Sequence, residues 1–164
     1  MVEQAKYTLL RTLGEVEVRA YTACVMAKTE LPLDDRNLAF RQVASYIFGG
    51  NKEKKQIAMT APVVMSHKIK TFTMAFIMPE EYSKQSLPAP ISAAVKLESV
   101  PARTIAALRF SGFTSEQKTD EQIARLLAIL AAEKIRVKGA PFVLGYNAPW
   151  TLPFLRRNEV AVEI

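Results

Sequence analysis

The sequence predicts one α+β domain, a distorted eight-stranded open barrel with two long helices outside it. Apolar and polar residues alternate in several stretches, two others have helical apolar spacing, and a strand-strand-helix-strand-strand order occurs twice. These occurrences, at about residues 7–80 and 92–164, predict two pseudo-symmetric halves of a single domain covering residues 1–164. Because two helices cannot cover both faces of eight strands, we expect the sheet to curve on itself.

The first half contains four expected strands and one helix. Alternation predicts strands over residues 7–11, 15–30, 57–65 and 71–78, with a turn near His67 between the last two. Pro32 ends the second strand, and helix one is expected over 35–48, with Asp34 or Asp35 capping its start. Residues 82–91, which hold Pro88 and Pro90, form the best linker in the sequence.

The second half repeats that order. Strands are expected over residues 95–100, 103–110, 142–146 and 159–164, and helix two is expected over 115–133. Ile123, Leu126, Leu127 and Leu130 supply the apolar stripe of this helix. Thr114 with Gln117, or Thr119 with Gln122, could form a capping box at its start.

Composition excludes several classes of protein. The chain has 22 Lys and Arg against 16 Asp and Glu, a formal net charge of +6, which modestly favours anionic partners. No nucleic-acid reading motif accompanies this charge, and a single cysteine, Cys24, excludes an internal disulfide. With no signal peptide or membrane span in the sequence, we expect a cytoplasmic protein, although an exported chain that had lost its leader would read the same way.

The sequence predicts a protein that is not an enzyme. His67 is the only imidazole, and no nucleophile elbow, phosphate-binding glycine loop or paired metal-ligand motif is present. The alternative is a carboxylate-based hydrolase in which Glu17, Glu30 or Glu159 has a raised pKa in a pocket. The competing interpretation of these residues is exposed strand carboxylates paired with Arg19, Arg157 or lysines.

Flat or pliable apolar side chains are unusually frequent around the first helix and the strands that follow it. Methionine adapts to a broad planar ring, so these residues could line a site for one, although at this spacing most are expected in the core. They are Met59, Met65, Met74, Met78, Phe40, Phe48, Phe72 and Phe76.

Several segments, in order, resemble the SOUL/haem-binding protein family. They span the chain from about residue 16 to residue 164, and their number and order carry the resemblance. The segments are Val16-Glu-Val-Arg19-Ala-Tyr21; Phe40 followed by Tyr46-Ile-Phe-Gly-Gly-Asn51 and Ile57-Ala-Met-Thr-Ala-Pro-Val63; Phe76-Ile-Met-Pro79 with Pro88-Ala-Pro90; Arg109-Phe110-Ser-Gly112-Phe113; Gly145-Tyr146-Asn147-Ala-Pro149; and Arg157-Asn158-Glu159-Val160.

The resemblance implies a barrel with two pseudo-symmetric halves, and reversible binding of haem b or another porphyrin against helix one. On that helix it implies contacts from Asn37, Phe40, Arg41, Ala44, Ser45 and Phe48, and near the final turn from Thr151 and Leu152. Mammalian members carry basic residues where this chain has Asn37, Ser45 and Thr151 or Leu152. Arg36 or Arg41 could replace them, because a guanidinium can bind a propionate in a bidentate way.

The iron ligand is left open by the resemblance. Some members are proposed to use a histidine in the first long strand, where this chain has Ala20. His67 is the remaining axial-ligand candidate, and a tyrosine, a methionine or no protein ligand are alternatives of equal standing.

The leading functional prediction is therefore non-catalytic binding of a tetrapyrrole for transport, buffering or sensing. The second hypothesis is that the chain is a binding module for another hydrophobic small molecule or for a protein partner. Hydrolysis of a small ligand is the third hypothesis, and it would rest on analogy of fold.

Overall fold

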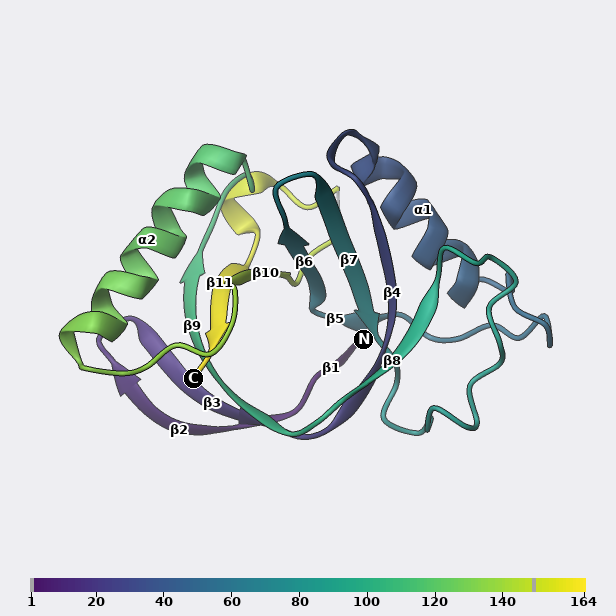
Figure 1. Cartoon of the computed structure of the whole chain (residues 1–164), viewed down its shortest axis with the longest axis horizontal. Helices are drawn as coiled ribbons and strands as arrows, with labels where there is room; N and C mark the ends of the chain where they lie inside the picture. Colours follow the sequence, from purple (N-terminus) through teal and green to yellow (C-terminus); the bar gives the residue numbers. More distant parts are fainter. Residues whose placement is uncertain (1, 149) are drawn as a thin grey trace. The chain divides into compact units, whose positions relative to one another are not determined.

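The computed structural model, which describes residues 2–148 and 150–164, divides into two compact units, each with antiparallel strands and one helix packed on them (Figure 1). Unit 1 holds the chain as far as Ala5 together with Ala23–Pro101, and unit 2 holds Lys6–Thr22 and Ala102–Ile164. The predicted α+β class is confirmed. The predicted halves differ from these units, because the first hairpin belongs to unit 2; a single domain with two repeats stays a prediction.

In unit 1 the sheet has the strand order β6-β7-β4-β8, and all three pairings are antiparallel. The strands are β4 (Cys24–Pro32), β6 (Val63–His67), β7 (Thr71–Ile77) and β8 (Lys96–Val100). A short parallel pair, β1 (Glu3–Gln4) with β5 (Thr60–Ala61), also belongs to this unit.

Helix α1 (Arg36–Ile47) packs on β4 and β7 of unit 1. Ala39, Val43 and Ile47 recur every four residues and are fully buried, so they form the inward face of the helix. The predicted cap is wrong, because neither Asp34 nor Asp35 makes a side-chain cap hydrogen bond. A 3-10 turn, Leu33–Asp35, leads the chain into the helix instead.

In unit 2 the strand order is β2-β3-β9-β11-β10, and α2 (Glu116–Ala132) packs on β9 and β11. The strands are β2 (Tyr7–Leu13), β3 (Val16–Tyr21), β9 (Arg103–Phe110), β10 (Phe142–Gly145) and β11 (Asn158–Glu163). Leu126 and Leu130 are fully buried. The Ser115 hydroxyl accepts a hydrogen bond from the Lys118 backbone N–H at 3.3 Å, so both capping boxes predicted from neighbouring threonines are wrong.

Two expected strands are divided in the structure. Residues 15–30 form β3 and β4, because β3 pairs with β2 and β9 of unit 2 whereas β4 pairs with β7 and β8 of unit 1. Residues 57–65 are interrupted at Pro62, which has no N–H to donate to a ladder. Among the described residues, the antiparallel strands therefore number nine, four in unit 1 and five in unit 2, where eight were expected.

The expected linker, residues 82–91, is a packed loop inside unit 1. Leu87 and Pro88 are buried, and the Tyr46 hydroxyl donates to the Pro88 carbonyl at 2.8 Å. Burial raises the pKa of Tyr46 to about 12, so this hydroxyl keeps its proton at neutral pH. The loop therefore contributes to the unit 1 core. No helix within residues 2–148 and 150–164 is both long enough and apolar enough to span a membrane.

Candidate functional site

The six predicted contact residues of α1 share one face of the helix. At 3.6 residues per turn, Asn37, Phe40, Arg41, Ala44, Ser45 and the helix-ending Phe48 fall within an arc of about 140°. Ala44 is buried, whereas the other five are exposed, including 38% of Phe40 and 63% of Phe48. We call these six residues the α1 face. The helix therefore turns two large phenyl rings and a guanidinium toward solvent on one side.

Phe40 connects the α1 face to the core of unit 1. Its ring centroid lies 5.7 Å from that of Phe76, a buried residue of β7, with the two planes tilted by 58°. This contact fixes the position of Phe40 while leaving part of the ring exposed. Arg41 follows it directly and is exposed, so a flat apolar group and a carboxylate could be met by adjacent residues.

His67 ends β6 and lies on the sheet side that carries α1, whereas a turn was expected at this residue. In the β6–β7 pairing His67 stands opposite Phe72, and opposed residues point to the same face. The His67 and Phe72 ring centroids are 5.2 Å apart, and Arg36 Nη2 of α1 lies 3.4 Å from His67 Nδ1. The structure therefore brings this histidine beside the first turn of α1.

Most of the methionine and phenylalanine side chains that the sequence singled out belong to the unit 1 core, as expected. Phe72, Met74, Phe76 and Met78 are buried, and Met59 and Met65 pack partly buried against the same cluster. Phe40 and Phe48 are the two that remain exposed. They are the members of this set that are available to a ligand.

Thr151 and Leu152 belong to unit 2, whereas the α1 face and His67 belong to unit 1. Both lie before the 3-10 turn Pro153–Leu155. The Thr151 carbonyl accepts a hydrogen bond from Arg156 Nε at 2.7 Å, and 55% of Leu152 is exposed. The α1 face and His67 therefore share unit 1, and contact of Thr151 and Leu152 with a ligand stays a prediction. Pro149, which ends one of the segments quoted for the resemblance, lies outside the described residues.

A buried ionic network in unit 2 was not anticipated. Arg19 of β3 donates from Nη1 and Nη2 to the two carboxylate oxygens of Glu159 of β11, at 2.6 and 2.8 Å. Arg157 Nη2 donates to Glu159 Oε1 at 2.8 Å, and the Tyr146 hydroxyl donates to Oε2 at 3.1 Å. Arg19 Nε also donates to Glu17 at 2.7 Å. The predicted pairing of Glu159 with arginines is confirmed, but its predicted exposure is wrong, because the residue is fully buried.

This network does not supply the raised carboxyl pKa that a hydrolase would need. Burial acts to raise the pKa of Glu159, but hydrogen bonds and attraction from Arg19 and Arg157 outweigh it and lower the pKa. Burial and the negative charge of Glu159 raise the pKa of Tyr146. Hydrogen bonds from Thr71 and Lys68 lower the pKa of Glu30. The pKa of each of these two carboxyl groups, Glu159 and Glu30, is therefore lowered, the opposite of what the hydrolase hypothesis requires.

Charged residues inside otherwise apolar strands were the available sequence signal for this network. Arg19 lies between Val18 and Ala20, and Glu159 precedes an apolar run in β11. Strand positions of this kind place a charge on a sheet face, where burial requires a partner. In the part of the chain that the structure describes, no group of three or more His, Cys, Asp or Glu side chains could hold a metal ion.

Comparison with solved structures supports the fold. The C-terminal domain of EcmrR superimposes with a TM-score of 0.69, covering 96% of each chain at 8% identity. A structure described as a hydrolase from Listeria innocua superimposes with a TM-score of 0.66, covering 90% of each chain at 12% identity. Identities this low show a shared fold and nothing about shared chemistry.

Sequence comparison identifies the family. Heme-binding protein 2 of Homo sapiens is 31% identical over 159 residues, covering 90% of this chain and 77% of the human protein. The family model described as "SOUL heme-binding protein" matches residues 2–163. The chain therefore belongs to the SOUL heme-binding protein family.

Proposed function

We propose that this chain binds haem b or another tetrapyrrole reversibly on the α1 face, as a transport, buffering or sensing protein without catalytic activity. The observation that carries the proposal is the exposure of Phe40 and Phe48 on the side of α1 that also presents Arg41. Membership of a family described as heme-binding supports the same ligand class.

The chemistry of the α1 face fits a porphyrin. Phenyl rings offer flat apolar area for the macrocycle, and the small side chain of Ala44 lets a planar ring approach the helix. Arg41 would bind a propionate, with Asn37 and Ser45 as neutral hydrogen-bonding neighbours. Bound haem would supply an iron centre open to an axial ligand. Thr151 and Leu152 stay in the proposal as contacts from unit 2.

His67 is the proposed axial-ligand candidate, but its hydrogen bond with Arg36 disfavours iron ligation. A guanidinium has no acceptor, so an Arg36 hydrogen bond to Nδ1 requires Nδ1 to accept and places the proton of a neutral ring on Nε2. A protonated nitrogen cannot ligate iron. Binding through apolar and ionic contacts on the α1 face therefore comes first in the proposal, and iron ligation by His67 requires this contact to break.

Hemin titration tests the proposal. We expect a Soret shift that saturates near one equivalent, with the affinity falling about fivefold in Arg41→Ala, the loss of one exposed charge-assisted hydrogen bond. Arg11→Ala, which removes an exposed arginine from unit 2, is the matched control and should leave the titration unchanged. An unsaturable shift, or equal weakening by both variants, would overturn the proposal.

His67→Ala separates the two parts of the proposal. If His67 ligates the iron, this variant changes the visible bands of the ferric complex in addition to any change in affinity. Unchanged bands would exclude ligation by His67 and leave binding on the α1 face in place. Native mass spectrometry of the protein as purified identifies a different hydrophobic small molecule, should the α1 face hold one.

A further inference from the structure

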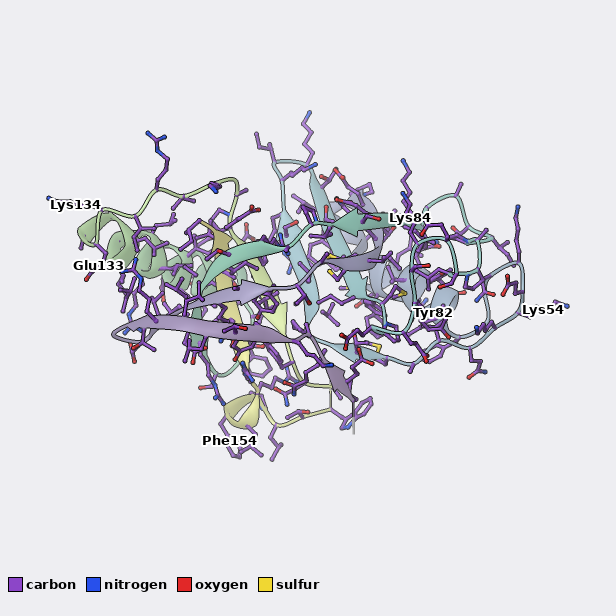
Figure 2. All side chains as sticks on the ribbon, turned by 90° about the horizontal axis from the view of Figure 1, so that it is seen from below. Lys54, Tyr82, Lys84, Glu133, Lys134 and Phe154 are labelled. Atoms are coloured by element: carbon purple, nitrogen blue, oxygen red, sulfur yellow. The ribbon has the colours of Figure 1, made fainter. Side chains whose placement is uncertain are left out.

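We propose that two copies of this chain associate through β2, pairing their β2 strands antiparallel about a two-fold axis at Leu10. β2 ends the strand order of unit 2: one side pairs with β3, and within the described residues no strand pairs with its other side. Figure 1 shows β2 outermost in that order, and β2 and β3 lie side by side as purple strands in Figure 2. A row of backbone N–H and C=O groups is therefore open to a further strand. This inference goes beyond tetrapyrrole binding and concerns a surface of unit 2.

The side chains of β2 leave apolar surface beside this open edge. Six of its seven residues are exposed, including 37% of Tyr7, 50% of Leu9 and 54% of Leu10, and one of the seven is charged. β8, which ends the strand order of unit 1, has two charged residues among five. Because charges on an edge strand discourage another strand from pairing with it, β8 is protected in a way that β2 is not.

The sequence of β2 is nearly symmetric about Leu10, which favours a second copy as the partner. An antiparallel pair centred there sets residues of one copy opposite residues of the other as follows: Tyr7 with Leu13, Thr8 with Thr12, Leu9 with Arg11, and Leu10 with Leu10. Apolar pairs and Thr–Thr pairs of this kind stabilise a sheet. This register also keeps the two Arg11 side chains apart, whereas a pair centred at Arg11 would set like charges opposite each other. Since a two-fold contact requires a self-complementary patch, the symmetry of β2 meets that requirement.

A β-bulge in β2 falls at the same residue. Leu9 pairs with Arg19 of β3 and Arg11 pairs with Val18, so Leu10 has no partner on β3. A bulge bends an edge strand and can discourage a further strand when it is combined with charge. Here the extra residue is a half-exposed leucine, and at the two-fold axis each Leu10 covers the other. The contact therefore buries the apolar side chain that β3 leaves unpaired.

Sedimentation velocity of the full chain, without hemin, tests the association. We expect a reversible equilibrium between monomer and dimer as the protein concentration rises to about 1 mM. Species larger than a dimer should not form, because a two-fold contact closes on itself. A monomer over the whole concentration range would overturn the proposal, and so would a growing series of larger species.

A charge placed at the two-fold axis tests which surface is used. Leu10→Asp sets two carboxylates opposite each other, so the dissociation constant of the dimer should rise about tenfold or more. Ile69→Asp, the same kind of change at a residue of unit 1 that is 94% exposed, is the matched control and should leave the dissociation constant unchanged. Equal effects of the two variants would overturn the assignment to β2.

A disulfide cross-link tests the register. With the only native cysteine removed by Cys24→Ser, Leu10→Cys sets two thiols opposite each other at a Cα separation of about 4.5–5.5 Å, within reach of a disulfide. Leu13→Cys is the matched control, because each Leu13 faces Tyr7 of the other copy and the two Leu13 positions lie about 20 Å apart. We expect an added oxidant to link the Leu10 variant into a covalent dimer and to leave the Leu13 variant unlinked.

Linking of the Leu13 variant, or of neither variant, would overturn the pairing about Leu10. Hemin titration of the same variants reports separately on the proposed function, because none of these substitutions lies on the α1 face.

Discussion

The α1 face and the ionic network of unit 2 use similar residue types in opposite ways. In the network, Arg19 and Glu159 are buried, and four hydrogen bonds from two arginines and one from a tyrosine reach the Glu159 carboxylate. On the α1 face, Arg41 and Phe48 are exposed to solvent. The buried network is suited to holding strands together, and the exposed α1 face is suited to binding a ligand. Arginine and aromatic residues in one neighbourhood therefore do not by themselves mark a binding site.

The largest expected effect is on the stability of unit 2. Glu159→Ala removes both hydrogen bonds between the buried Arg19 guanidinium and a buried carboxylate, and leaves it the partly exposed Glu17 and Tyr21 and the ring of Tyr7. We expect a loss of about 3–5 kcal/mol in the free energy of unfolding, measured by urea titration.

Two variants make this prediction specific. Glu163→Ala, on the same strand but outside the network, should cost far less than Glu159→Ala. Replacing Arg19 and Glu159 together by Met should recover part of the loss, because an apolar pair leaves no buried charge uncompensated. If the double variant is the least stable of the three, the account of the network is wrong.

The next largest effect on stability is expected at Asn51, whose side chain holds the loop that follows α1. Asn51 is fully buried, donates to the carbonyls of Tyr46 at 3.1 Å and Lys55 at 2.7 Å, and accepts from the Lys55 N–H at 3.0 Å. Asn51→Ala should cost about 2 kcal/mol in the free energy of unfolding, because it leaves these backbone groups unpaired. Asn37→Ala, at an exposed position of α1, should be close to neutral in the same measurement.

The pH dependence of the free energy of unfolding tests the ionised state of Glu159 in the buried network, for which the α1 face has no counterpart. Because the folded pKa of Glu159 lies below its ordinary value of 4.5, the folded protein binds fewer protons at this site than the unfolded chain does. The stabilisation that ionised Glu159 contributes is complete above pH 4.5, its ordinary pKa, and is lost as the pH falls through the lower pKa of the folded state. We expect the free energy of unfolding to decline less steeply in acid for Glu159→Gln than for the unmodified protein, measured by urea titrations at successive pH values. Parallel curves would contradict the lowered pKa.

The smallest effect on stability should come from the α1 face, where the effect on binding is expected to be clear. Phe48→Ala should change the free energy of unfolding by less than about 0.5 kcal/mol. Its affinity for hemin should fall about tenfold, because the ring that would cover the ligand is lost. Phe113→Ala removes an equally exposed ring from unit 2 and should leave the hemin titration unchanged.

Much of the fold followed from local patterns. The expected strand over residues 103–110 has the bounds of β9, and the expected helix over 35–48 differs from α1 by one residue at each end. The division of residues 15–30 did not follow, since the residues keep their alternation while their pairing partners lie far away in the sequence. Ser115 was missed as a cap because Thr114 offers the same chemistry one residue earlier.

The candidate site was predictable where it depends on one helix. The spacing of Phe40, Ala44 and Phe48 defines a face without any tertiary information. The place of His67 beside Arg36 depends on the β6–β7 register, which the sequence pattern did not specify. The burial of Glu159 depends on β3 and β11 lying on either side of β9, an arrangement that joins residues 140 positions apart.

The path of the chain through the two units bears on how the protein is made. The backbone passes from one unit to the other after Ala5, after Thr22 and after Pro101. During synthesis β2 and β3 leave the ribosome early, yet β9, against which β3 pairs, begins at Arg103 and β11 ends at Glu163. Unit 2 can close only when the residues up to Glu163 have emerged, so its folding is expected to be slow and its early hairpin exposed to misassociation until then.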